Sequence, residues 1–146
     1  MLDDLLKYIN NEDIASEDNC KIFMVLDTDL DKARIREIKE IEQRCINNNI
    51  EIITSAPTFE IWFVMHYRNN KLIFQTSKDV KKELQNINGV YTESMDMFKI
   101  VESMTNNART VAQSFEQQAI KNREELLYVN PHTSIYKILN TIDEFS

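Results

Sequence analysis

The chain has 146 residues, with 17 basic and 24 acidic side chains and a formal net charge of −7. This length suits one domain, and a hydrophobic share of 42% is enough to form its core. One glycine and two prolines exclude a glycine-rich phosphate loop, a dinucleotide-binding G-x-G-x-x-G motif and a β-sandwich. The acidic balance argues against nucleic-acid binding by bulk electrostatics, although a local acidic site could still reach nucleic acid through a metal ion.

Cysteine usage and the N-terminal residues indicate the compartment. Cys20 and Cys45 form no C-x-x-C motif and have no histidine at metal-ligand spacing, so we expect free thiols in a reducing environment. Asp3 and Asp4 stand where a signal peptide would begin with basic residues, and no apolar run approaches the ~20 residues of a membrane span. We therefore expect a cytoplasmic protein without a membrane partner.

The first half of the chain predicts a helix followed by a strand–helix–strand unit. Residues 1–11 carry leucine and isoleucine at helical spacing, and a polar loop follows. Residues 21–26 are continuously apolar, as in a strand buried on both faces of a parallel sheet. Residues 32–46 have helical spacing and residues 50–53 form a second apolar run. This βαβ unit predicts a right-handed crossover.

The second half predicts helices. Residues 57–67 are apolar nearly all round, which predicts a buried helix with Pro57 in its first turn. Ser77 is the expected N-cap of a helix through Ile87. Residues 93–127 predict one long helix. The segment that starts at Asn130-Pro131 opens a last helix, whose inward residues are expected to be Ile135, Ile138, Leu139 and Ile142.

These elements predict an α/β fold with a small parallel sheet and a helix-rich C-terminal half. We expect a single domain over residues 1–146. Its parts are an N-terminal helix and loop (1–19), a βαβ core (20–68) and a helical part (69–146).

Three aspartates, Asp27, Asp29 and Asp31, follow the first strand directly. Side chains alternate along an extended chain, so Asp27 and Asp29 are expected to point the same way, beyond the carboxyl end of the sheet where ligands bind. Converging carboxylates repel each other unless a cation lies between them, and Mg²⁺ takes one or two carboxylates. We predict a Mg²⁺ or Mn²⁺ site at Asp27 and Asp29, with Asp31 as a third candidate ligand. The simpler alternative is that Asp29 or Asp31 only caps the next helix.

Two other kinds of site also contain closely spaced aspartates of this type. An EF-hand is excluded, because Lys32 and Ile38 stand where its loop needs glycine and glutamate. A haloacid-dehalogenase-like phosphatase would use Asp27 as nucleophile and Thr54 in its second motif. Asp31 and the lack of a later acidic pair at a strand end argue against that enzyme.

Glu60 and His66 lie in an otherwise apolar helical segment. Glu60 is at the start of this helix, where the helix dipole favours an acid, and it follows the second strand, which places it near the aspartates. The structural alternatives are dipole pairing alone for Glu60 and a half-buried imidazole for His66.

The order and spacing of three segments resemble the RloB-like family. They are Asp27-x-Asp29 after an apolar strand, residues 57–62 followed by His66, and residues 130–133. Residues 107–109 give weaker support, and the likeness covers roughly residues 20–142. The supporting site residues on this resemblance are His66, Arg109, Asn130 and His132.

Proteins of this family are similar to Toprim domains, the metal-dependent fold of topoisomerases, primases and OLD-type nucleases. They occur beside restriction-modification loci or with an ABC-type ATPase in anti-phage defence, including abortive infection. The resemblance implies Mg²⁺-dependent cleavage of DNA or RNA phosphodiesters, with Asp27, Asp29 and Glu60 as catalytic residues and the metal at the aspartates.

The sequence departs from the family pattern in three ways. Toprim domains use a glutamate at the end of an earlier strand as general acid or base, whereas residues 1–19 predict a helix and a polar loop, with Glu12 and Glu17 in polar surroundings. Ala56 stands where the family has asparagine, and Thr92-Glu93 where it has lysine. An alternative function is therefore a catalytically reduced binding or regulatory subunit of an ABC-type ATPase. A homodimer is also compatible with the sequence.

Overall fold

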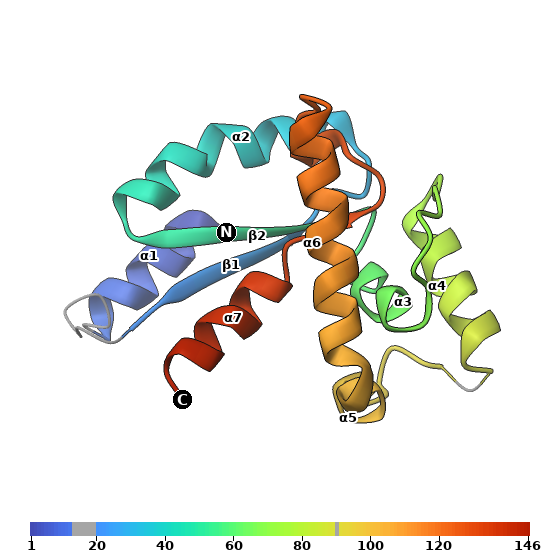
Figure 1. Ribbon diagram of the computed structural model, residues 1–146. Coiled ribbons are helices and arrows are strands. Elements are labelled where there is room, and N and C mark those ends of the chain that lie inside the picture. Colours follow the sequence, from blue (N-terminus) through green and yellow to red (C-terminus); the bar gives the residue numbers. More distant parts are fainter. Residues whose placement is uncertain (13–19, 90) are drawn as a thin grey trace.

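A three-stranded sheet lies at the centre of the part of the chain that the computed structural model describes, residues 1–12, 20–89 and 91–146 (Figure 1). Strands β1 (Ile22–Asp27) and β2 (Ile50–Ala56) are parallel and joined by helix α2 (Lys32–Asn47). Strand β3 (His132–Thr133) pairs antiparallel with the end of β2, which gives the order β1-β2-β3. The α/β class and the strand–helix–strand unit are confirmed.

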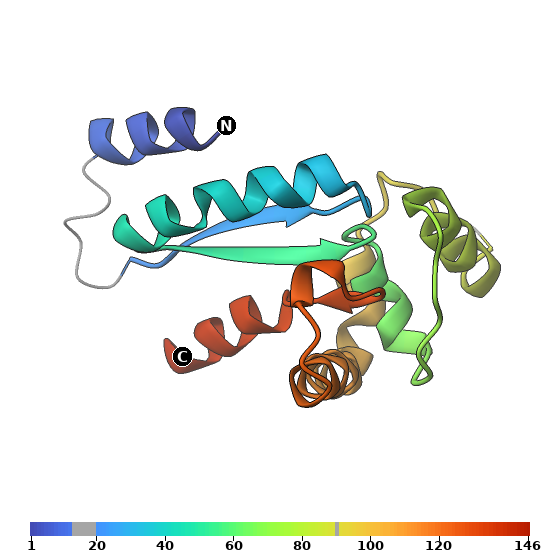
Figure 2. The same ribbon diagram turned by 90° about the horizontal axis from the view of Figure 1, so that it is seen from above.

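The sheet has a different helical layer on each face. Figure 2 shows α1 (Leu2–Asn11) and α2 on one face and α6 (Thr105–Lys121) and α7 (Tyr136–Glu144) on the other. The first layer forms a small core with the strand residues Met24 and Leu26. The second core is larger and joins the sheet to the helices that follow it. The prediction that β1 is buried on both faces is wrong: Met24 and Leu26 are buried in the first core, but on the other face Phe23 is only partly buried against the second core and Val25 is 44% exposed.

Strand β2 is longer than the predicted run of residues 50–53, since it continues to Ala56. Two of the added residues, Thr54 and Ser55, are polar, and β3 together with Ser134 supplies their hydrogen-bond partners. The Ser55 and Thr133 hydroxyls are 2.7 Å apart, and the Thr54 backbone N–H donates to the Ser134 hydroxyl at 3.0 Å. Partners from the C-terminal end of the chain therefore allow this polar segment to remain buried in the sheet.

Helix α3 (Ile61–Tyr67) lies beyond the carboxyl ends of the parallel strands and packs against α4 (Ser77–Ile87) and α6. The helix begins at Ile61 and not at Pro57, so the prediction that Pro57 lies in its first turn is wrong. Its residues from Ile61 to His66 are all buried, as predicted. The N-cap of α4 is Thr76 and not Ser77. The Asp79 backbone N–H donates to the Thr76 hydroxyl at 3.2 Å, and the Thr76 backbone N–H donates to the Asp79 carboxylate at 3.1 Å. This reciprocal capping box leaves the Ser77 hydroxyl available for another contact.

The predicted long helix over 93–127 is wrong. The chain instead forms α5 (Met97–Val101), a 3₁₀ turn at Glu102–Met104, α6, and a second 3₁₀ turn at Leu126–Tyr128. The Asp96 carboxylate caps α5 by accepting from the Lys99 backbone N–H at 3.3 Å. Apolar spacing continues across the 3₁₀ turn, so periodicity alone could not locate this break.

The C-terminal segment also differs from expectation. Residues 132–133 form β3 and do not open the last helix, which begins at Tyr136. Ile135 is buried as predicted, whereas Ile142 is 54% exposed. Both cysteines are free, with Cys45 buried and Cys20 exposed. Among the described residues, no helix combines the length and apolarity that spanning a membrane requires.

Candidate active site

The backbone beyond β1 brings the first aspartates to the start of α3. The Thr28 N–H donates to the Ser55 carbonyl at 3.0 Å, and the Asp29 N–H donates to the Pro57 carbonyl at 2.9 Å. Asp29 and Leu30 then adopt left-handed conformations, with φ of 51° and 57°. Such a conformation costs a bulky residue about 1 kcal/mol or more. A strained turn at Asp29 and Leu30 therefore connects the end of β1 to the start of α2.

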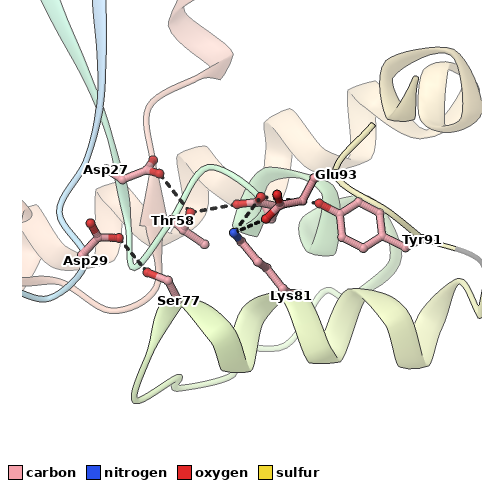
Figure 3. Close-up of polar contacts among 8 residues, drawn as sticks. Asp27, Asp29, Thr58, Ser77, Lys81, Tyr91 and Glu93 are labelled. Atoms are coloured by element: carbon pink, nitrogen blue, oxygen red, sulfur yellow. Dashed lines mark hydrogen bonds and ion pairs between the residues drawn. The ribbon is translucent and has the colours of Figure 1, made fainter. Parts of the chain in front are cut away.

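The carboxylates of Asp27 and Glu60 meet at the hydroxyl of Thr58 (Figure 3). The Thr58 Oγ1 lies 2.9 Å from Asp27 Oδ2 and 2.8 Å from Glu60 Oε2. A hydroxyl carries one hydrogen, so it can fully satisfy only one of the two carboxylate oxygens. A proton on one carboxyl group, or a cation beside it, would complete the arrangement. The predicted proximity of Asp27 and Glu60 is therefore observed.

The surroundings of Asp27 disfavour its charged form. Burial raises the pKa of the Asp27 carboxyl, and the negative charges of Glu60 and Asp29 add to the rise. The hydrogen bond from Thr58 opposes it. Asp27 is thus a half-buried carboxylate that gains from a cation or from a shared proton.

Glu60 also faces a cation and a phenol. Lys81 Nζ, from α4, lies 3.8 Å from Glu60 Oε1 and makes a shorter ion pair with Glu93. The Tyr91 hydroxyl donates to Glu60 Oε1 at 3.4 Å. Burial and then the charges of Glu60 and Glu93 raise the pKa of Tyr91 to about 12, so Tyr91 stays protonated near neutral pH and acts as a donor.

Asp29 and Asp31 have separate partners. The Ser77 hydroxyl donates to Asp29 Oδ1 at 2.8 Å, and Arg34 Nη1 lies 3.6 Å from Asp29 Oδ2. The expectation that Asp27 and Asp29 lie on the same side of one extended chain is wrong. Strand β1 ends at Asp27, and Asp29 lies in the left-handed turn. Asp31 is the N-cap of α2 and accepts from the Ala33 N–H at 2.9 Å. The capping alternative therefore describes the observed contact of Asp31.

His66 and Arg109 contact other parts of the fold. His66 Nδ1 is 2.8 Å from the Trp62 carbonyl, and its Nε2 is 3.4 Å from the Thr105 hydroxyl. Burial lowers the pKa of His66, so the imidazole is buried in its neutral form near neutral pH. Arg109 Nη1 donates to Asp143 at 2.5 Å, which ties α6 to α7.

Asn130 and His132 secure the C-terminal segment. Asn130 makes hydrogen bonds with both backbone groups of Phe74 through its side-chain amide. His132 Nδ1 is 2.8 Å from the Val129 carbonyl, and its Nε2 is 2.9 Å from the Thr54 hydroxyl. This contact occupies the residue that the phosphatase alternative needed in its second motif.

Sequence reasoning missed Thr58, Ser77, Lys81 and Tyr91 as members of the site. Thr58 lies inside the family-like segment, directly before the acid it contacts. Ser77 and Lys81 are four residues apart on α4 and reach Asp29 and Glu60, so one face of that helix serves the site. That i, i+4 spacing was the available signal for them. Tyr91 follows α4 and carried no comparable pattern.

The oxygen-rich donor set suits a hard divalent ion. Among the described residues, no group of three or more His, Cys, Asp and Glu side chains could hold a metal ion. Mg²⁺ does not require such a group, because it binds through one or two carboxylates and keeps water molecules for substrate phosphates. The crowded Asp27, with the carboxylate of Asp29 nearby, fits that mode of binding.

Comparison with known proteins identifies the family. A family model described as RloB-like protein matches residues 2–142, nearly the whole chain. Searches of curated proteins and of solved structures each gave no match. The matched region includes both parallel strands, α3 with Glu60, and β3. The chain belongs to the RloB-like family.

Proposed function

We propose that this chain is a metal-dependent, nuclease-like domain that cleaves phosphodiester bonds of DNA or RNA in an anti-phage or restriction-associated system. The observation that carries the proposal is the meeting of Asp27 and Glu60 on the Thr58 hydroxyl, at the carboxyl ends of parallel strands. Membership of the RloB-like family supports it, given the resemblance of that family to Toprim domains.

In this proposal Asp27 and Asp29 hold Mg²⁺ or Mn²⁺, which when bound stabilises the negative charge that develops on the phosphate. Glu60 accepts the proton of the attacking water. The Thr58 hydroxyl has one hydrogen and can donate it to only one of the two carboxylates. When Thr58 donates to Asp27, the proton that Glu60 Oε2 takes from the water forms a hydrogen bond to Thr58 Oγ1. Tyr91 and Lys81 hold Glu60 in place through its other oxygen.

The test is a cleavage assay on DNA and RNA substrates with Mg²⁺ or Mn²⁺. Asp27→Asn should reduce the cleavage rate at least 100-fold, the usual effect of removing a group that stabilises the transition state. Asp31→Asn is the matched control: asparagine also caps helices, so this variant should keep the wild-type rate. Failure to cleave any substrate, or equal rates for wild type and Asp27→Asn, would contradict the proposal.

A second candidate is a catalytically reduced subunit that binds or regulates an ABC-type ATPase. The observation that favours it is that site carboxylates already have cationic partners within the chain, Asp29 with Arg34 and Glu60 with Lys81. This candidate predicts co-purification with an ATPase encoded beside it, unchanged by Asp27→Asn, and no metal-dependent cleavage. Cleavage that depends on Asp27 would rule it out.

A further inference from the structure

Asp29 lies between two helices, and each of them contacts a different oxygen of its carboxylate. From α4, the Ser77 hydroxyl donates to Oδ1 at 2.8 Å (Figure 3). From α2, Arg34 Nη1 lies 3.6 Å from Oδ2, a distance that makes an ion pair but is too long for a hydrogen bond. One oxygen is therefore fixed by a neutral donor, while the other faces a cation that is only loosely held.

The position of Arg34 in α2 indicates that its charge does not serve to stabilise that helix. Arg34 is in the first turn, which contains no acidic residue after the N-cap Asp31. The helix dipole disfavours a cation in this turn. The side chains of Arg34 and Asp29 are 44% and 45% exposed, so water reaches the ion pair between them. Such an ion pair is weak, and another cation can take its place.

A second carboxylate lies beside Arg34. Arg34 and Glu37 line the same hollow, which has a volume of about 490 Å³. Glu37 is three residues further along α2, a spacing at which side chains on a helix are neighbours. Arg34 can therefore exchange Asp29 for Glu37 without losing a carboxylate partner.

We propose that Arg34 is a counter-ion that competes with a divalent ion for Asp29, and that Ser77 is the positioning residue that holds this carboxylate for either cation. The inference rests on the proposed function, in which Asp27 and Asp29 hold Mg²⁺ or Mn²⁺. When the ion binds, Arg34 turns toward Glu37, while Ser77 keeps the carboxylate oriented, as hydrogen bonds to metal-ligating carboxylates do. Removing Arg34 and removing Ser77 should therefore have opposite effects on metal affinity.

The test measures Mn²⁺ affinity by isothermal titration calorimetry on the full chain, without nucleic acid. Arg34→Gln removes the competing charge and should tighten Mn²⁺ binding about 3- to 10-fold, the effect of one charge screened by water. Ser77→Ala should weaken binding about 10- to 100-fold, the usual effect of losing a hydrogen bond to a metal ligand. Ser77→Thr keeps a hydroxyl and should retain the wild-type affinity.

Two controls separate these roles from net charge and from folding. Arg36→Gln removes the same charge from an exposed position of α2. Residues two apart on a helix do not face each other, so this variant should bind Mn²⁺ as wild type does. The capping box of α4 is formed by Thr76 and Asp79, so Ser77→Ala leaves the start of that helix intact. Equal tightening by Arg36→Gln and Arg34→Gln would reduce the effect to net charge and overturn the competition.

The remaining outcomes distinguish this inference from the proposed function. If Mn²⁺ binding depends on Asp27 but has the same affinity in wild type and Arg34→Gln, the competition is wrong and the proposed function stands. Equal affinities of wild type and Ser77→Ala would overturn the positioning role in the same way. Absence of any Mn²⁺ binding that depends on Asp27 would overturn both the inference and the proposed metal site.

Discussion

Lys81 places a positive charge beside the carboxylate of Glu60. Lys81 reaches Glu60 and Glu93 from α4, and its hydrogen bond to Glu93 is the main reason why its pKa is raised. Lys81 therefore stays charged near neutral pH. The resemblance to the RloB-like family implies a lysine after Tyr91, where this chain has Thr92-Glu93. Here Lys81, on α4, places a positive charge beside Glu93, which lies between α4 and α5.

Replacing Lys81 by methionine should slow metal-dependent cleavage. The loss of one charged hydrogen-bonding partner near Glu60 corresponds to about 10- to 100-fold in rate. Lys82→Met removes an exposed lysine from the same helix and should leave the rate unchanged. The comparison requires single-turnover cleavage rates for both variants. Equal rates for the two variants would show that Lys81 does not serve the site.

The sequence could predict some site residues and not others. Asp27 ends one parallel strand and Glu60 follows the other. The carboxyl ends of parallel strands meet at one edge of a sheet, so their proximity was predictable. The position of Lys81 depends on the path of the chain between α3 and α4, about which hydrophobic periodicity says nothing. Asp29 was misplaced because two successive residues in left-handed conformations carried no glycine to indicate the turn.

At the scale of elements, the two-residue strand β3 locks the end of the chain to β2. His132 is buried and bonded to the Val129 carbonyl and the Thr54 hydroxyl. Its Nδ1 donates to the carbonyl, so its Nε2 accepts the Thr54 proton in the neutral imidazole. Protonation of Nε2 would turn it into a donor to the Thr54 hydroxyl oxygen and would place a positive charge in a buried site. Burial accordingly lowers the pKa of His132.

This contact predicts a loss of stability in mild acid. The unfolded chain binds a proton at histidine with a pKa of about 6.5, while the folded chain binds it less readily. Stability is therefore complete above that pH and decreases as the pH falls below about 6.5. Urea unfolding at pH 7.5 and 5.5 should show the decrease, and His132→Gln should reduce its size. His66, whose pKa burial also lowers, accounts for the remainder. The same pH dependence in wild type and His132→Gln would contradict the assignment.

Elements set by local signals were predicted, and those set by distant partners were not. The helices α1, α2 and α4 and the strand β1 lie within a few residues of their predicted positions, because their apolar spacing and flanking polar residues are local. The end of β2 and the existence of β3 depend on hydrogen bonds between residues about 80 apart in the chain, such as Thr54 and Ser134. No local pattern encodes that pairing.

At the scale of the whole molecule, the net charge of −7 is partly concentrated at one edge of the sheet. Asp27, Asp29 and Glu60 lie close enough to affect one another, and the resulting repulsion destabilises the folded chain. Functional sites often retain such unfavourable groups at a cost of stability. Asp27→Asn removes one of these charges and should raise the melting temperature in the absence of metal, while abolishing cleavage.

Divalent ions should raise the melting temperature only when the Asp27 carboxylate is present. An ion that binds only the folded chain stabilises it by about 2.7 kcal/mol at 100 times its dissociation constant, which corresponds to about 5–10 °C for a protein near this size. We expect Mg²⁺ or Mn²⁺ to raise the melting temperature of the wild type and of Asp31→Asn, but not of Asp27→Asn. Equal shifts in all three proteins would place the ion elsewhere. The absence of any metal-dependent shift, in a chain that cleaves no nucleic acid, would instead favour the regulatory subunit, because Arg34 and Lys81 would then be the cations that the site carboxylates use.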